Sequence, residues 1–320
     1  MRKALVYIIS VFLLADFFIV NYIVSPVYSL PERSLDVPVD IERIKNDVYL
    51  LTNTPEPRNS FNIQSLNLAA DYIKQEFSNI SDRVEEQVYQ VENNDFRNII
   101  CSFGPEEGER VIVGAHYDVC HEQPGADDNA SGVAGLLELA RILKVRSPEH
   151  RIDLVAYSLE EPPFFKTPHM GSYVHAKYLK DNEIPVKAMI SLEMIGYFSE
   201  EEDSQDFPFS LMKLLYPTKG NFIAVVGKVG QRSLTKKVKT SMISASAIPV
   251  KSINAPKFVQ GIDFSDHLNY WIFGYPAIMI TNTSFYRNKN YHEKTDTPET
   301  LDYEKMAEVI KGCYRAIVEL

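Results

Sequence analysis

The sequence predicts a three-layer α/β/α sandwich with a mostly parallel central sheet. Runs of continuously apolar or β-branched residues alternate with segments of helical periodicity, as expected for a sheet buried on both faces. The expected strands cover residues 83–91, 96–103, 111–119, 152–159, 186–195, 222–227 and 276–281. The expected helices cover residues 41–52, 61–77, 131–145, 172–182, 231–245, 263–273 and 303–320.

Composition is consistent with one α/β domain and argues against nucleic acid as a partner. The chain has 320 residues, of which 45% are hydrophobic, so it can bury a large core. Its 33 Lys and Arg residues face 43 Asp and Glu residues, which gives a net charge of −10 and no basic cluster. Cys101, Cys120 and Cys313 form neither a disulfide framework nor a zinc knuckle, although a single bridge remains open. We expect Cys120 to be structural rather than nucleophilic.

The N-terminus predicts export through a membrane. Two basic residues precede an apolar run over residues 4–24, which only Asp16 and Asn21 interrupt. About 20 apolar residues suffice to span a bilayer, so we expect an uncleaved signal-anchor that forms a transmembrane helix. The rest of the chain then faces outside the cytoplasm, or is periplasmic or secreted if the segment is cleaved as a signal peptide. The expected anchor, linker and single catalytic domain are residues 1–25, 26–39 and 40–320.

Reactive side chains follow the expected strands, at the edge where ligands collect in such sheets. In the expected strand over residues 111–119, the apolar run VIVGA leads into His116 and Asp118, and the segment GADDNASG opens the next helix. Later strands lead into Glu160 and Glu161, into Glu193, and into the segment NYHEKTDTPET with His292. Imidazole nitrogen and carboxylate oxygen suit zinc, and a bridging carboxylate allows two ions about 3.5 Å apart.

The adjacent Asp127 and Asp128 are the least expected feature of this pattern. One acidic residue at a helix start suits the helix dipole, but two buried carboxylates side by side are costly unless a cation or hydrogen bonds compensate. We expect Asp127 to bridge two ions, which would offset this cost.

Six ordered motifs resemble the co-catalytic dizinc aminopeptidases of metallopeptidase family 28. They are AHYD, GADDNASG, LEE, LEMIGY, SDH and YHEKTDTPETLDY, and the resemblance covers residues 40–320. Relatives of this family include glutamate carboxypeptidase and glutaminyl cyclase. The resemblance implies the phosphorylase/hydrolase-like architecture of zinc peptidases and two zinc ions per chain.

Carried over to this sequence, the resemblance implies a complete set of zinc ligands. His116, Asp127 and Glu193 would hold one zinc. Asp127 would bridge to a second zinc held by Glu161 and His292. The resemblance also implies a cis peptide bond between Asp127 and Asp128.

Three further residues have expected roles in catalysis. The resemblance implies that Glu160 is the general base and that Asp118 orients His116. Tyr291, directly before a ligand, is a candidate donor to the oxyanion. The segment from Glu200 to Pro217 is either a solvated loop or a lining of the substrate entrance.

These residues favour an aminopeptidase that uses metal-activated water on peptides with a free N-terminus. One alternative is a glutaminyl-cyclase-like aminoacyltransferase, which uses a single zinc in the related family. Another is a non-catalytic receptor-like domain on the same fold, which loss of ligands would mark. No predicted ligand is lost here, and the set of five favours two metals.

Overall fold

The computed structural model describes residues 20–28 and 37–320. Its centre is an eight-stranded sheet in the order β1-β2-β4-β3-β5-β8-β6-β7. The strands are β1 (Val84–Val91), β2 (Asn94–Phe103), β3 (Arg110–His116), β4 (Arg151–Tyr157), β5 (Val186–Glu193), β6 (Ile223–Lys228), β7 (Val250–Ala255) and β8 (Ala277–Thr281).

The central strands run parallel, as the sequence predicts. Strand β3 pairs in parallel with β4 and β5, β5 pairs in parallel with β8, and β6 with β7. Antiparallel pairing is confined to β1 with β2, β2 with β4, and β6 with β8. The carboxyl ends of β3, β4, β5 and β8 therefore meet at one edge of the sheet.

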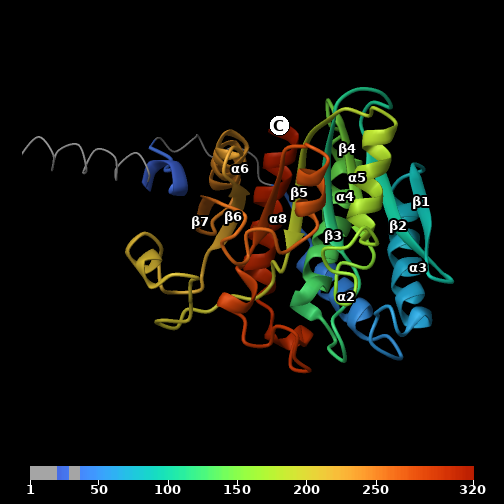
Figure 1. Ribbon diagram of the computed structural model, residues 1–320, viewed down its shortest axis with the longest axis horizontal. Helices are drawn as coiled ribbons and strands as arrows, with labels where there is room; N and C mark the ends of the chain where they lie inside the picture. The colour runs from blue at the N-terminus through green and yellow to red at the C-terminus, as the bar shows by residue number, and fades with distance from the viewer. Residues whose placement is uncertain (1–19, 29–36) are drawn as a thin grey trace, which may run out of the picture.

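Helices cover both faces of the sheet, which completes the three layers (Figure 1). One face packs against α2 (Ile41–Thr52), α3 (Ile63–Ile80), α4 (Gly132–Val145), α6 (Arg232–Ala245) and α8 (Tyr303–Glu319). The other face packs against α5 (Gly171–Asp181) and α7 (His267–Ile272).

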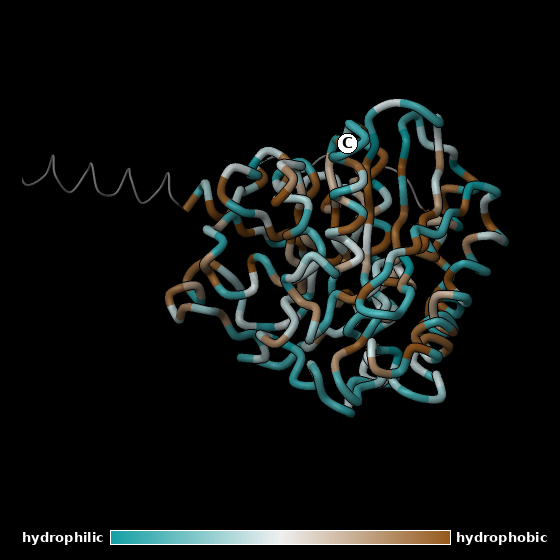
Figure 2. The backbone as a smooth tube through the Cα atoms, turned by 45° about the vertical axis from the view of Figure 1, so that its right-hand side comes forward, coloured by the Kyte–Doolittle hydropathy of each residue, from teal (hydrophilic) through white to brown (hydrophobic). Residues whose placement is uncertain are grey.

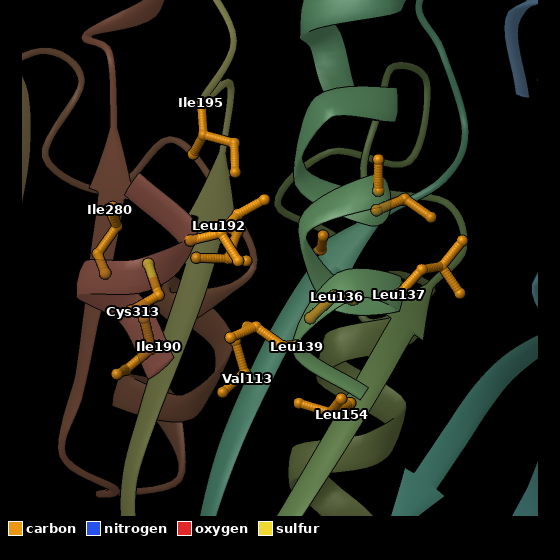
Figure 3. Close-up of a cluster of buried hydrophobic side chains, with 14 of the residues drawn as sticks. Val113, Leu136, Leu137, Leu139, Leu154, Ile190, Leu192, Ile195, Ile280 and Cys313 are labelled. Atoms are coloured by element: carbon orange, nitrogen blue, oxygen red, sulfur yellow. The ribbon is translucent and has the colours of Figure 1, made fainter. Parts of the chain in front are cut away.

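Alternation along the strands divides the apolar side chains between the two faces. Val113 on β3 and Leu154 on β4 face α4, whereas Ile112 and Val155 face the α5 side. Figure 3 shows Leu136, Leu137 and Leu139 of α4 in the same buried cluster as Val113 and Leu154 of the sheet. In Figure 2 the apolar segments run along the interior strands, and many outer loops are hydrophilic.

Strand β7 is the one strand of the described residues that the sequence pattern did not predict. Its sequence VKSINA mixes apolar and polar residues without a continuous apolar run, because β7 is an edge strand with Lys251 and Ile253 only half-buried. Helix α7 is also shorter than predicted. The chain at Ile262 and Ser265 still forms turns, and the helix begins at His267.

The predicted anchor lies mostly outside the described residues. Residues 20–24 are helical and lie beside α6 and β7, where Lys239 Nζ and Ser252 Oγ donate to the carbonyl of Val24 at 3.1 and 2.7 Å. Among residues 20–28 and 37–320, no helix has the length and apolar character needed to span a membrane. Residues 1–19 of the predicted anchor and residues 29–36 of the predicted linker are not described.

Candidate metal centre

The carboxyl ends of β3, β4 and β5 bring His116, Glu160, Glu161 and Glu193 together, as the sequence predicts. All four side chains are buried. His292 approaches from the loop after β8 and remains partly exposed, with its backbone in the left-handed region at φ 60°. These residues are far apart in the sequence, and the parallel sheet makes them neighbours.

Asp128, and not Asp127, lies between the two histidines. Its Oδ1 is 3.4 Å from Nε2 of His116, and its Oδ2 is 3.3 Å from Nε2 of His292. The two oxygens of one carboxylate thus face two separate groups of donors. The prediction that Asp127 occupies this position is wrong.

Asp127 points away from the histidines into a network of neutral donors. Its Oδ1 accepts hydrogen bonds from the amides of Gly196 and Tyr197 at 2.9 and 3.2 Å. Its Oδ2 accepts from the side-chain amides of Asn282 and Asn288, both at 2.8 Å. Five donors, including the Ser131 hydroxyl at 3.3 Å, therefore satisfy this buried carboxylate without a cation.

The backbone around the pair explains which carboxylate turns inward. Gly125 precedes it with φ 66°, and a Cβ there would lie 2.3 Å from the carbonyl oxygen of Asp128. The cis peptide bond is between Asp128 and Asn129, and not between Asp127 and Asp128 as predicted. The segment from Ala126 to Ser131 forms a single irregular helical turn that directs the two side chains to opposite sides.

The separations between the donors are those of ligands that share an ion. Two ligand atoms about 2.05 Å from a tetrahedral zinc lie about 3.3 Å apart. The His116 Nε2 to Glu193 Oε2 distance is 3.4 Å, and the His292 Nε2 to Glu161 Oε2 distance is also 3.4 Å. In addition, Nε2 of His292 is a buried atom without a hydrogen-bond partner in the described residues. The residues present therefore fit a metal pair.

Two half-sites can be defined from these distances. The inner half-site consists of His116, Asp128 and Glu193, and the outer half-site consists of His292, Asp128 and Glu161. Asp128 belongs to both.

Glu160 stands outside both half-sites. Its carboxylate is 4.0 Å from Nε2 of His116, and no hydrogen bond from the described residues to that carboxylate is present. Burial raises the pKa of Glu160 well above its ordinary value; His116 opposes this rise, and Glu161 and Glu193 add to it. A buried carboxylate beside the metal ligands and free of structural bonds is suited to proton transfer.

Asp118 acts on the site through two different groups. Its backbone carbonyl lies 3.2 Å from Nδ1 of His116. Because a carbonyl only accepts, this contact places the ring proton on Nδ1 and leaves Nε2 as a ligand atom. Its carboxylate accepts from the amides of Glu160 and Glu161 at 3.1 and 3.0 Å, so it positions the glutamate pair.

The electrostatics of the assembled side chains favour a cation. Burial raises the pKa values of Glu161 and Glu193, and neighbouring carboxylates add to the effect. Burial would lower the pKa of His116, but the surrounding carboxylates, Glu193 and Glu160 before Asp118 and Asp128, together raise it well above its ordinary value. Buried carboxylates that raise one another's pKa values create a negative potential, and this potential favours the binding of a cation.

Two supporting residues were not predicted. The buried carboxylate of Asp296 accepts from the amides of Asp127 and Asp128, both at 3.0 Å. The guanidinium of Arg58 is fully buried and donates to the carbonyls of Tyr117 and Gly125 at 2.8 and 2.7 Å. Together they fix the two loops that carry the inner half-site.

A cavity of about 290 Å³ opens from the donors into an apolar chamber. Its lining includes Phe165, Val226, Ile262, Phe264, Met279 and Phe285. Tyr291 also lines it and stacks on His292 with 3.8 Å between ring centroids. Phe207, Pro208 and Met212 contribute as well, which favours the second reading of the segment from Glu200 to Pro217.

Residues 98–317 match the family model described as "Peptidase family M28". The chain belongs to this peptidase family. A relative described as uncharacterized protein YfbL of Escherichia coli is 48% identical over 85% of each chain. A leucine aminopeptidase 1 of Ajellomyces capsulatus is 27% identical over 70% of this chain, and a probable zinc metalloprotease of Leptosphaeria maculans is 28% identical over 67%. The chain spans 56% and 52% of the lengths of the latter two.

Solved structures share the fold of this M28 peptidase. The LapA aminopeptidase of Legionella pneumophila superposes with a TM-score of 0.70 at 19% identity, over 92% of this chain and 77% of that one. The glutaminyl cyclase of Porphyromonas gingivalis superposes with a TM-score of 0.67 at 19% identity, over 89% and 99%. Aminopeptidases and cyclases thus share this architecture, and family membership supports a hydrolase that acts on peptides.

Proposed function

We propose that the protein is a zinc-dependent aminopeptidase that removes apolar residues from the N-terminus of peptides. The observation that carries this proposal is the position of Asp128 between His116 and His292, at 3.4 and 3.3 Å. These separations, and those to Glu193 and Glu161, match ligands on two adjacent ions. The aminopeptidase and zinc metalloprotease names of two relatives support the same reading.

The residues around the donors divide the chemical work. Zinc held by the two half-sites would lower the pKa of a water molecule and polarise the scissile carbonyl. The Glu160 carboxylate takes a proton from the attacking water and returns it to the departing amine. Tyr291 lies beside His292 in the cavity wall, where its hydroxyl can donate to the oxygen of the reacting carbonyl.

The charge of the cavity favours a substrate N-terminus over a C-terminus. Asp128, Glu160, Glu161 and Glu193 form one end of the cavity lining. Among the described lining residues, Lys251 is the one Lys or Arg, and it belongs to edge strand β7. With two zinc ions bound, the three ligand carboxylates are neutralised, and Glu160 is the carboxylate left to attract a free ammonium group. No lysine or arginine of the described lining stands beside the donors to pair with a terminal carboxylate. The adjoining apolar walls then receive the first side chain.

Hydrolysis of aminoacyl-nitroanilides tests the proposal. The purified full chain, loaded with zinc, should cleave leucyl and phenylalanyl nitroanilides and should leave N-acetylated versions intact. Zinc per chain, measured by mass spectrometry, should approach two ions. Cyclisation of an N-terminal glutamine with one zinc per chain would indicate a cyclase instead. Zinc binding without turnover of either substrate would favour a receptor-like domain.

We also propose that the protein is exported and stays attached to the membrane. The support is the apolar run of residues 4–24 behind Arg2 and Lys3. Cell fractionation tests this, because an anchored chain sediments with membranes at high salt and detergent releases it. A full-length chain found with the cytoplasmic fraction would contradict the proposal.

A further inference from the structure

Cys120 lies against the outer half-site although the family pattern assigns it no role. Its Sγ, a carboxylate oxygen of Glu161 and a ring nitrogen of His292 all lie within 4.8 Å of one another. For a thiolate and an imidazole on one tetrahedral zinc, about 3.6 Å between S and N is expected. The three donors are therefore close enough to one another to hold one ion.

The loop that carries Cys120 is built to hold this side chain in place. The amide of Val119 donates to the carbonyl of Arg58 at 3.1 Å, and the side-chain amide of Asn59 donates to the carbonyl of His121 at 2.7 Å. Cys120 is 1% exposed, whereas the next residue, His121, is exposed and has a left-handed backbone with φ 49°. The chain therefore turns outward directly after directing the thiol inward.

Cys120 does not form a disulfide with another cysteine of the chain. Cys101 on β2 and Cys313 on α8 are free and buried in the main apolar core, apart from the donor cluster, and Cys120 itself is free. Neither of these cysteines is therefore placed to form a disulfide with Cys120. The side chains of Glu161 and His292 lie close to its sulfur.

We infer that Cys120 is a further ligand of the outer metal ion, bound as a thiolate beside His292 and Glu161. This inference deepens the proposed function, since it rests on the same two half-sites. When the metal binds, the S–H bond breaks, the proton passes to solvent and the sulfur lone pair forms the bond to the metal. The outer half-site is then softer than the inner one, which has only nitrogen and oxygen donors, and it binds zinc more tightly.

X-ray absorption of the zinc-loaded full chain gives a direct test. With two ions per chain, the spectrum should require half a sulfur per zinc at about 2.3 Å. A spectrum fitted by nitrogen and oxygen alone would overturn the inference. This measurement uses the unmodified protein, so it decides the question even if cysteine variants fold poorly.

Cobalt substitution assigns the sulfur to its residue. Thiolate bound to Co²⁺ produces an intense near-ultraviolet charge-transfer band, which should appear in the wild-type chain and in Cys101→Ala, a control at a remote thiol. The band should vanish in Cys120→Ala and Cys120→Ser. Cys120→Ala should also weaken the tighter of the two zinc sites by at least ~10-fold, since loss of even an outer-shell partner of a ligand costs roughly 10–100-fold. A band that persists in Cys120→Ala would overturn the assignment.

The test separates this inference from the proposed function. If the zinc-loaded chain cleaves nitroanilides but shows no sulfur ligand, the aminopeptidase proposal stands and the role of Cys120 is refuted. If the sulfur is present but no peptide is cleaved, the ligand assignment stands without the activity.

Discussion

Exchanging each of the two adjacent aspartates for asparagine should show that Asp127 is needed for the stability of the fold and Asp128 for metal binding. Asp127→Asn keeps the volume of the side chain but replaces one acceptor oxygen with an NH₂ group. Both oxygens of Asp127 accept hydrogen bonds. In either orientation of the new amide, its NH₂ group therefore faces N–H or O–H donors that have lost their acceptor. Asp128→Asn removes instead a charge that faces two imidazoles.

The magnitude follows from the number of donors that lose their acceptor. In the better orientation the amide replaces Oδ2, and the two donors from Asn282 and Asn288 are lost. A buried group left unsatisfied costs ~1–3 kcal/mol, so Asp127→Asn should destabilise the chain by ~2–6 kcal/mol. At about 2–4 °C per kcal/mol, the melting temperature should fall by about 4–24 °C. Asp128→Asn should change the stability of the metal-free chain by less than ~1 kcal/mol, because it also relieves repulsion with Glu161 and Glu193.

Thermal unfolding in EDTA, combined with zinc content after dialysis, measures both effects. Asp127→Asn should melt early and still bind zinc while folded. Asp128→Asn should melt near the wild type and lose most of its zinc. The reasoning would be refuted if Asp127→Asn lost zinc at an unchanged melting temperature while Asp128→Asn kept it.

Four further outcomes are expected. Glu160→Gln should lower kcat by about 10²–10⁴-fold with unchanged zinc content, and full activity would exclude Glu160 as the base. Arg58→Met removes four hydrogen bonds to carbonyls, so urea unfolding should show a loss of ~3–5 kcal/mol, and a loss below ~1 kcal/mol would contradict this. Burial lowers the pKa of His292, but the neighbouring Asp128 carboxylate and Cys120 thiol raise it to about 10, so this proton must leave when metal binds. Apparent zinc affinity in chelator competition should therefore weaken about tenfold for each unit by which pH falls from 9 to 7, and a flat profile would contradict it. Val226→Trp should fill the cavity. The ratio of kcat/KM for phenylalanyl nitroanilide to kcat/KM for alanyl nitroanilide should then fall by roughly 10–100-fold, whereas an equal loss for both substrates would refute the cavity assignment.

Most of the fold could be predicted because its strands are buried on both faces. Continuous apolar runs identify β3, β4, β5, β6 and β8, and their bounds differ from the predicted ones by at most three residues. Edge strand β7 carries no such run, since only part of it is covered, and the pattern of VKSINA is too polar to stand out. The prediction failed where burial, and therefore the apolar signal, is incomplete.

The metal site could be predicted as a set of residues but not as an arrangement. Strand ends place His116, Glu161 and Glu193 at one edge whatever the details of the loops. The orientation of the aspartate pair, in contrast, depends on an irregular turn whose geometry is fixed by Asp296, 168 residues away in the sequence. The hydrophobic periodicity of a sequence does not indicate a contact between residues so far apart in the chain. Sequence reasoning also passed over Arg58, because a basic residue before a helix is ordinarily solvent-exposed.

The two aspartates show what makes this a metal site rather than a buried polar network. Asp127 has five neutral donors within hydrogen-bond range and needs no cation. Asp128 has two imidazoles at 3.3–3.4 Å, beyond the usual range of ~2.7–3.2 Å. Burying this carboxylate with Glu161 and Glu193 costs several kcal/mol per ion without compensation. Neutral donors surround the first carboxylate, whereas the second has one, the Gln123 side-chain amide at 3.4 Å, and otherwise faces the imidazoles of His116 and His292, so the fold leaves Asp128 available to positive charge.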